Sequence, residues 1–299
     1  SNSVRFSAAT LAIRIAANTC EDTVAHNAYL VGKIMAARLD HPVERTDELD
    51  MLYQTSFGDC TIGIEAARRM LRTSYTIHGT TERLSRQLRV AFALKVCGDI
   101  AGSKALLEKV HAESVKEHLA STFSFASWRL SSIHLDLDDI IEAERWFGEY
   151  QRIAPVDREP LAGVIVNNHS VRIALVRGDL VRAEYHFLRG QESMLESGHL
   201  IRLAHSMATQ LGIARLRADI AEVAKVVDIA RPIFKKVQSS IGQSFFASEI
   251  ALSLATLGLL EEATCTANEY VRVRREQSPL PNYFTKRLEV FGIVIRQRT

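Results

Sequence analysis

The sequence predicts an all-α protein, a right-handed superhelical α-solenoid of antiparallel αα-hairpins with a period of 40 residues. Two observations on composition favour helices. The chain has only 15 glycines and 6 prolines among 299 residues, far fewer than the roughly 12% that average usage would give, so loops are few. Aromatic residues make up 7% and β-branched runs are short, which argues against a large sheet.

The third observation is an internal repeat. Six positions spaced 40 residues apart, here called the anchor residues, hold glycine four times: Gly58, Gly98, Asp138, Gly178, Ala218 and Gly258. Glycine at a fixed interval is typical of a turn that recurs in every unit of a repeat protein. The anchors therefore predict one tight turn inside each hairpin.

The residue after each anchor predicts where the second helix of the hairpin begins. These residues are Asp59, Asp99, Asp139, Asp179, Asp219 and Leu259. An aspartate at this place accepts hydrogen bonds from the N–H groups that open a helix. Glu142 and Glu222 follow three residues after two of the aspartates, a spacing typical of a capping box.

A column of small residues lies five positions past the anchors and predicts close contact between helices. It consists of Gly63, Ser103, Ala143, Ala183, Val223 and Ala263. Pro42, Pro160 and Pro281 punctuate the other half of the period, where proline is tolerated in the first turn of a helix. Each unit therefore contains two helices with short connections, which makes the helices antiparallel.

These signals divide the chain into three parts that form one continuous solenoid. Residues 1–41 form N-terminal helices, with Thr19 and Asp22 as the cap of a degenerate repeat. Residues 42–280 form six hairpins, and residues 281–299 form a C-terminal helix that caps the end.

Four segments after the anchors resemble the second half of tetratricopeptide (TPR) repeats. They read GDIAGSKALLEKV (98–110), DDIIEAERWFGEY (138–150), GDLVRAEYHFLRGQ (178–191) and GLLEEATCTANEY (258–270). Ordinary TPR units have 34 residues. The longer unit is similar to the repeat region of maltose-regulator-type bacterial transcription activators. The first helices depart from the family pattern, since only Leu211-Gly212 keeps the usual dipeptide, one residue out of phase.

The resemblance implies a concave groove lined by the first helix of each hairpin. The candidate groove residues are Phe125, Trp128, Asn168, Arg172, His205 and Arg215. Asparagine and arginine suit a peptide backbone or a carboxylate, and aromatic rings supply contact area. The alternatives are that the aromatic residues pack between helices and that Asn168 and Arg172 form a solvated or internally satisfied pair.

Other features of charge and composition limit the partners. Arg83, Arg86 and Arg89 form the densest basic patch and are candidates for anion binding, with a solvated helix face as the alternative. The formal net charge of +2 argues against nucleic acid as a partner. The cysteine spacing shows neither a disulfide framework nor a zinc motif, and no apolar run spans a bilayer. We therefore expect a cytoplasmic protein without contact to a membrane.

No motif of an enzyme is present, and we predict no catalytic residue, no metal site and no cofactor. The sequence has no HExxH, GxSxG or glycine-rich phosphate loop. His169, beside Asn167 and Asn168 in an apolar stretch, is interpreted as a satisfied core histidine rather than a base.

The predicted function is a non-enzymatic scaffold that binds a protein or peptide, as the regulatory helical-repeat region of a bacterial signalling or transcription-regulating protein. One alternative is a sensor module in which a small molecule or signal peptide controls an output domain. Another is self-association through the end helices, which would give a homodimer.

Overall fold

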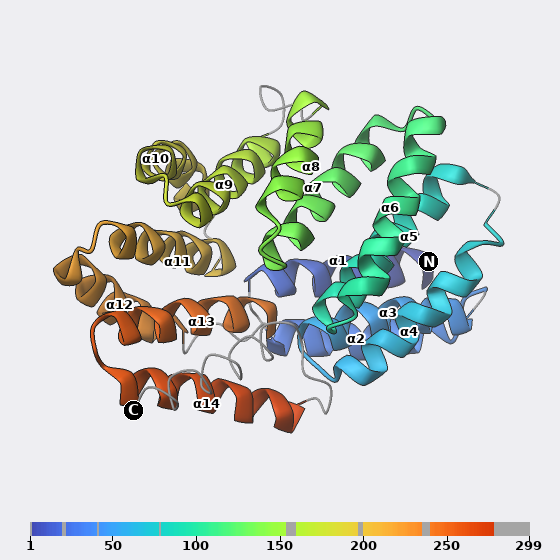
Figure 1. The fold of residues 1–299 in the computed structure, drawn as a ribbon. Coiled ribbons are helices and arrows are strands. Elements are labelled where there is room, and N and C mark those ends of the chain that lie inside the picture. The colour runs from blue at the N-terminus through green and yellow to red at the C-terminus, as the bar shows by residue number, and fades with distance from the viewer. Residues whose placement is uncertain are drawn as a thin grey trace. The chain divides into compact units, whose positions relative to one another are not determined.

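The computed structural model describes residues 2–19, 22–40, 42–77, 79–153, 160–196, 200–234 and 240–277. Within these ranges the chain forms 14 helices and no strand (Figure 1). The helices are α1 (Asn2–Thr19), α2 (Asp22–Ala36), α3 (Pro42–Ser56), α4 (Cys60–Ser74), α5 (Thr80–Val96), α6 (Ile100–Lys116), α7 (Ala120–Asp136), α8 (Ile140–Ile153), α9 (Pro160–Arg177), α10 (Leu180–Glu196), α11 (Leu200–Leu216), α12 (Ile220–Phe234), α13 (Ser240–Thr256) and α14 (Leu260–Gln277).

The helices follow the 40-residue repeat. The second helix of each hairpin begins two residues past its anchor, and α3 and α9 begin at Pro42 and Pro160, as the sequence predicts. The members of a pair pack against each other, as in α7 with α8 and α9 with α10. The protein is an all-α solenoid of paired helices.

The chain divides into two compact units. Unit 1 contains Ser1–Met70, Val96–Gly98 and Ser197–Thr299, and unit 2 contains Leu71–Lys95 and Asp99–Glu196. Most of α5 and all of α6 to α10 therefore belong to unit 2. The predicted capping helix at 281–299 lies outside the described residues. That one solenoid runs continuously from 42 to 280 remains a prediction.

Five of the six anchors adopt the left-handed backbone that ends a helix. The φ angles are 89° at Gly98, 59° at Asp138, 71° at Gly178, 53° at Ala218 and 78° at Gly258. In each case the next N–H donates to the carbonyl five residues before it, at 2.8 to 3.0 Å. This bond is the Schellman cap of a helix C-terminus, which explains the preference for glycine. The two anchors with side chains hold this conformation at a cost of about 1 kcal/mol.

Gly58 is the exception, and its glycine has a different reason. A Cβ atom at this position would lie 1.9 Å from Gln54 Oε1. That oxygen accepts the N–H of Asp59 at 2.8 Å. Glycine at this anchor therefore leaves room for a side chain that caps the end of α3.

The five aspartates after the anchors cap the second helices, which confirms the predicted column. Asp99, Asp139, Asp179 and Asp219 accept the N–H three residues later, at 2.9, 3.3, 3.0 and 3.0 Å. Asp59 instead accepts the N–H two residues later, at 2.7 Å. The sixth repeat has Leu259 at this place, a side chain that cannot accept a hydrogen bond.

The column of small residues lies where the helices of a hairpin cross. All six of its members are buried. A Cβ atom at Gly63 would lie 2.9 Å from Thr55 Cγ2. Ser103 is small enough for its Oγ to donate to the carbonyl of Ala91 at 2.6 Å. The prediction of close helix contact at this column is confirmed.

Each unit has its own apolar core. In unit 2, a cluster of α7, α8 and α9 contains Leu135, Phe147, Tyr150 and Ile173. In unit 1, a cluster of α11 to α14 is centred on buried side chains that include Leu211, Val227, Phe246 and Ile250. The unit 2 core positions the first helices that carry the site described below.

The N-cap column gives a matched pair of stability tests. Asp179→Ala should lower the free energy of unfolding by about 1 kcal/mol, because an N–H at the start of α10 loses its acceptor. Leu259→Asp should raise it by a similar amount, because α14 gains the cap that the other repeats have. Urea titrations followed by circular dichroism measure both. Equal stability of Asp179→Ala and the wild type would mean that Asp179 contributes no cap.

Candidate functional site

Three charged side chains from three successive first helices meet in unit 2: Lys95 of α5, Asp136 of α7 and Arg172 of α9. Together with Arg129 of α7, whose charge acts on Lys95, we call them the Asp136 cluster. Lys95 Nζ lies 2.7 Å from Asp136 Oδ2, and Arg172 Nη2 lies 2.9 Å from Asp136 Oδ1. Lys95 also donates to Ser132 Oγ at 2.8 Å. The Asp136 side chain is only 4% exposed.

The repeat explains why these residues meet. Lys95, Asp136 and Arg172 lie three, two and six residues before their anchors, on the stretch of the first helix that the resemblance assigns to the groove. The hydrogen bonds that join α5 to α7 and α7 to α9 connect residues 36 to 38 positions apart. The cluster is therefore an inter-repeat contact between equivalent helix faces.

The charges of the cluster shift one another's pKa. Burial alone would raise the pKa of Asp136, but Lys95 and Arg172 outweigh burial and hold it below its ordinary value. Burial lowers the pKa of Lys95, and the neighbouring Arg172 and Arg129 add to this effect. Asp136 opposes that lowering only in part. The one carboxylate of the cluster thus forms ion pairs with two of its three basic side chains, Lys95 and Arg172.

Arg129 differs from the other cations in having aromatic rings as its neighbours. Its Cζ atom lies 4.2 Å from the ring centroid of Phe92 and 5.1 Å from that of Trp128. Burial lowers its pKa to about 10, so the guanidinium is still charged at neutral pH. Across the part of the chain that the structure describes, no carboxylate lies within ion-pair distance of Arg129.

The other predicted groove residues of unit 2 lie on the same helices. Phe125 is 39% exposed, and its ring meets Trp128 edge-on at 6.1 Å. Trp128 is half-buried and packs against the unit 2 core, so the alternative of inter-helix packing accounts for much of its surface. The half-buried Asn168 lies one helical turn before Arg172, and its amide makes no hydrogen bond with any described residue.

Two predicted groove residues belong to unit 1. Arg215 Nη2 lies 2.5 Å from Glu249 Oε2, and its Nη1 donates to Ser253 Oγ at 2.6 Å. The charge of Arg215 is therefore satisfied within the unit. His205 is part of α11, but its side chain lies outside the described residues. Binding roles for both residues remain predictions.

The three arginines of α5 are half-buried and do not form a solvated face. Arg83 forms an ion pair with Glu113, with one contact of 2.9 Å between Nη1 and Oε2. Arg86 lies 4.0 Å from Glu82. Arg89 also has an interaction partner. Their role as an anion site remains a prediction, and Glu113 already neutralises Arg83.

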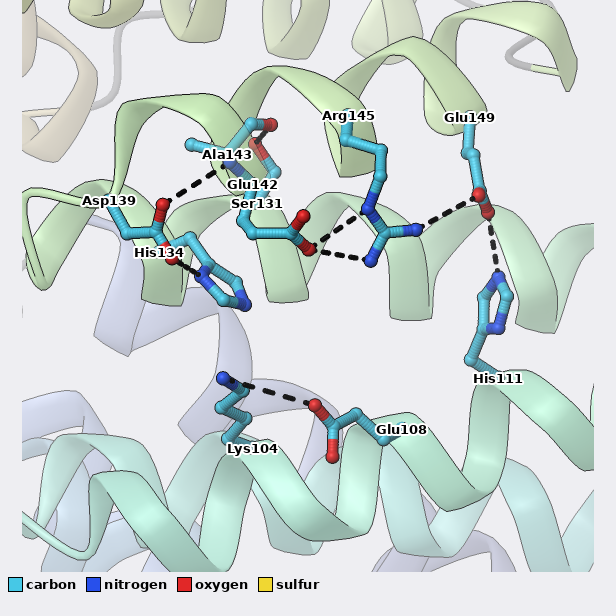
Figure 2. Close-up of polar contacts among 10 residues, drawn as sticks. All are labelled: Lys104, Glu108, His111, Ser131, His134, Asp139, Glu142, Ala143, Arg145 and Glu149. Carbon is cyan, nitrogen blue, oxygen red and sulfur yellow. Dashed lines mark hydrogen bonds and ion pairs between the residues drawn. The ribbon is translucent and has the colours of Figure 1, made fainter.

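The second helices α6 and α8 carry a separate polar network (Figure 2). Arg145 Nη2 lies 2.7 Å from Glu142 Oε2, and its Nη1 lies 3.6 Å from Glu149 Oε1. His111 Nε2 lies 2.9 Å from the other oxygen of Glu149. The Arg145 guanidinium also lies over the Trp146 ring, at 4.1 Å. Arg145 therefore has two carboxylate partners in this network.

Ser131 and His169 form a contact that resembles a nucleophile and base, but its hydrogen bond has the opposite direction. Ser131 Oγ donates to the Ala143 carbonyl at 2.6 Å, which uses its only proton. His169 Nε2, 2.6 Å from the same Oγ, must then donate to it. Burial holds the pKa of His169 well below 6.5, so the ring is neutral. The geometry agrees with the interpretation of His169 as a core histidine.

The described residues lack two further features, a metal-binding cluster and a membrane-spanning helix. No group of three or more His, Cys, Asp or Glu side chains in these ranges could hold a metal ion. Nor does any helix in these ranges have both the length and the apolar character needed to cross a bilayer.

Comparison with known proteins supports the fold. No protein-family model and no curated protein matches the chain. Among solved structures, a Rap protein complexed with competence and sporulation factor is similar over 99% of this chain and 98% of that chain, with a TM-score of 0.60 and 10% identity. This likeness confirms a TPR-like helical-repeat fold. The maltose-regulator type of repeat remains a prediction.

The sequence predicts part of this site. Trp128, Asn168 and Arg172 are candidate groove residues, and Asp136 lies at a groove position that the resemblance implies. Lys95, Arg129 and Phe92 are not among the predicted residues. A signal was present, because Lys95 and Asp136 are opposite charges at groove positions of successive repeats. Pairing charges across one repeat length would have identified that contact.

The first test of the site concerns the carboxylate at its centre. Asp136→Ala should lower the free energy of unfolding by about 3 kcal/mol, because it leaves buried cations without their partner. Glu144→Ala breaks the exposed ion pair with Arg177 and should cost no more than about 1 kcal/mol. Urea titrations measure the free energy of unfolding of both variants. If Asp136→Ala lost no more of it than Glu144→Ala does, the stability of the cluster would not depend on this carboxylate.

The second test uses the buried histidine. Below pH 6.5 the unfolded chain binds a proton at His169 that the folded chain excludes, because the folded pKa is lowered. The free energy of unfolding should therefore fall as the pH falls from 7 to 5, by up to about 1.4 kcal/mol per pH unit. His169→Gln removes this titrating group, and its stability should vary less over the same range. If the free energy of unfolding changed equally with pH in the wild type and in His169→Gln, His169 would not be the group responsible.

Proposed function

We propose that the protein is a non-enzymatic regulatory scaffold that binds a peptide along the first helices α5, α7 and α9 of unit 2. The observation that carries the proposal is the set of unsatisfied groups on these helices. Phe125 presents an exposed ring. Among the described residues, the Asn168 amide has no hydrogen-bond partner and Arg129 has no carboxylate at ion-pair distance.

These groups match the chemistry of an extended peptide. An asparagine side chain offers one acceptor and two donors, which pair with the N–H and C=O groups of a backbone. An exposed aromatic ring supplies contact area at low conformational cost. Binding is therefore the function that the geometry supports best.

The similar solved structure supports the same class of function. It holds a Rap protein complexed with competence and sporulation factor, so a helical-repeat chain of this length and fold can present a binding surface to a partner molecule. By this analogy and the repeat type, we place the chain in the regulatory part of a bacterial signalling or transcription-regulating protein. A cytoplasmic location fits this role.

Selection from a displayed library of random 12-residue peptides tests the proposal. We expect enriched peptides that bind the purified chain, and Asn168→Ala should weaken their binding about tenfold, because hydrogen bonds to the peptide backbone are lost. Arg172→Ala combined with Asn168→Ala should weaken binding further while leaving the helical circular dichroism signal unchanged. Titration calorimetry measures the affinities.

Arg189→Ala is the matched control, since Arg189 is an exposed arginine on the second helix α10, and this variant should bind like the wild type. Failure to enrich any peptide, or full binding by the double variant, would contradict the proposal. A small molecule that raises the melting temperature where peptides do not would instead favour the sensor function.

A further inference from the structure

We propose that two copies of this chain associate through the outer face of α10, with the two α10 helices parallel to each other. This face, called the α10 stripe below, consists of Val181, Tyr185 and Leu188. The association goes beyond the proposed peptide binding, which uses the first helices of unit 2, and does not depend on it. Exposure, a contrast among the repeats and the pattern of charges support it.

The α10 stripe is the exposed side of a helix whose other side is already buried. Val181, Tyr185 and Leu188 are 78%, 53% and 64% exposed. On the opposite side of the helix, Ala183 and Gly190 are buried, and α10 packs against α9. A surface helix normally has one apolar face and one polar face. A second apolar face is typical of a surface that binds another protein molecule.

The stripe belongs to this repeat and not to the repeat in general. Its residues lie three, seven and ten positions past the anchor Gly178. Each of the other five second helices has a charged residue at one or more of these places. They are Glu65 and Arg68 of α4, Glu108 of α6, Arg145 of α8, Lys225 and Asp228 of α12, and Glu261 of α14. The hairpin turn and the helix crossing, which all repeats share, therefore do not require apolar residues here.

The spacing of the stripe is that of a two-stranded coiled coil. Steps of four and three residues separate Val181, Tyr185 and Leu188, which corresponds to the d, a and d positions of a heptad. In a parallel pair of helices, a side chain at one of these positions packs against the same position of the partner helix. One apolar stripe can therefore cover its own copy in a symmetric dimer.

The charges beside the stripe fit a second copy in the parallel direction. Arg182 and Arg189 lie along one edge, at the e positions, and both are exposed. Glu184 lies along the other edge, at a g position. In a parallel pair, a g residue faces the e residue five positions further on in the partner helix. Glu184 of each copy therefore meets Arg189 of the other, whereas an antiparallel pair would bring the two arginine edges together.

Contacts within α10 hold this positive edge beside the stripe. Arg189 Nη1 donates to Tyr185 Oη at 2.6 Å, and Arg189 Cζ lies 5.6 Å from the centroid of the Tyr185 ring. Burial lowers the pKa of His186, and the charges of Arg182 and Arg189 add to this effect. The two arginines therefore act on the same part of the helix, where a carboxylate of the second copy can approach them.

The mass of the purified full chain in solution tests the proposal. Because the stripe covers only about two helical turns, and small interfaces associate weakly, we expect a dimer that forms at high protein concentration. In analytical ultracentrifugation, the weight-average mass should rise from 33.4 kDa toward twice this value as the concentration increases from about 1 to about 500 µM. A chain that stays monomeric over this range would overturn the proposal.

Substitutions in the stripe locate the interface. Val181→Gln combined with Leu188→Gln should raise the concentration at which half of the chains are dimeric at least tenfold, because apolar contact is lost in both copies. Both side chains are exposed, so the helical circular dichroism signal should not change. Ile141→Gln is the matched control, since Ile141 is 73% exposed and lies three residues past its anchor, as Val181 does. This control should dimerise like the wild type. Unchanged dimerisation of the double variant would place the interface elsewhere and overturn the proposal.

Charge reversal tests the direction of the two helices. Glu184→Arg and Arg189→Glu should each weaken dimerisation about fivefold, because two exposed ion pairs become repulsive contacts. An equimolar mixture of the two variants should recover the dimer, since each chain then carries the charges that the other lacks. A mixture that dimerises no better than its components would overturn the parallel pairing.

Two further outcomes concern other occupants and the proposed function. Suppose that the wild type stays monomeric but binds vesicles with one third anionic lipid, and that the double variant does not bind them. The stripe would then be a membrane contact, and the dimer would be overturned. A monomer that binds the selected peptides would likewise overturn the dimer alone, whereas a dimer that binds no peptide would contradict only the proposed function.

Discussion

The left-handed residue between the two helices of a hairpin is the constraint on which the structure depends. It stops the first helix, and the N–H that follows it closes the cap with a bond of 2.8 to 3.0 Å. The aspartate at that next position then opens the second helix. Because the turn is so short, the second helix must return along the first, and the small residues five positions past the anchor let the two helices touch. Asp138 and Ala218 show that the turn is kept even where a side chain makes it costly.

This local character explains why most of the fold could be predicted from the sequence. Glycine in the turn and aspartate at the cap act within a few residues, and a small residue at the crossing acts within one hairpin, as Ser103 does with Ala91. Each therefore leaves its own periodic signal. Gly58 shows the limit of such reasoning. Its place in the series is the same, but the glycine serves to admit the Gln54 side chain, a role that depends on a contact between side chains and leaves no signal in a single column.

The candidate site could be predicted only in part, because its contacts connect different repeats. Arg172 and Arg215 occupy comparable predicted groove positions, yet the first shares Asp136 with Lys95 and the second is fully paired with Glu249. Neither partner can be identified from the helix that carries the arginine. The equivalent residue of the neighbouring repeat decides whether a charge is neutralised, and this requires the repeat register together with the packing of successive first helices.

Arg129 illustrates how equivalent positions of a repeat scaffold can carry opposite charges. Nine residues before an anchor, a glutamate completes an ion pair in unit 1, whereas in unit 2 this position holds an arginine without a carboxylate at ion-pair distance among the described residues. The rings of Phe92 and Trp128 hold that arginine without using its hydrogen-bond donors. The position that completes an ion pair in one pair of repeats therefore holds a stacked cation in another.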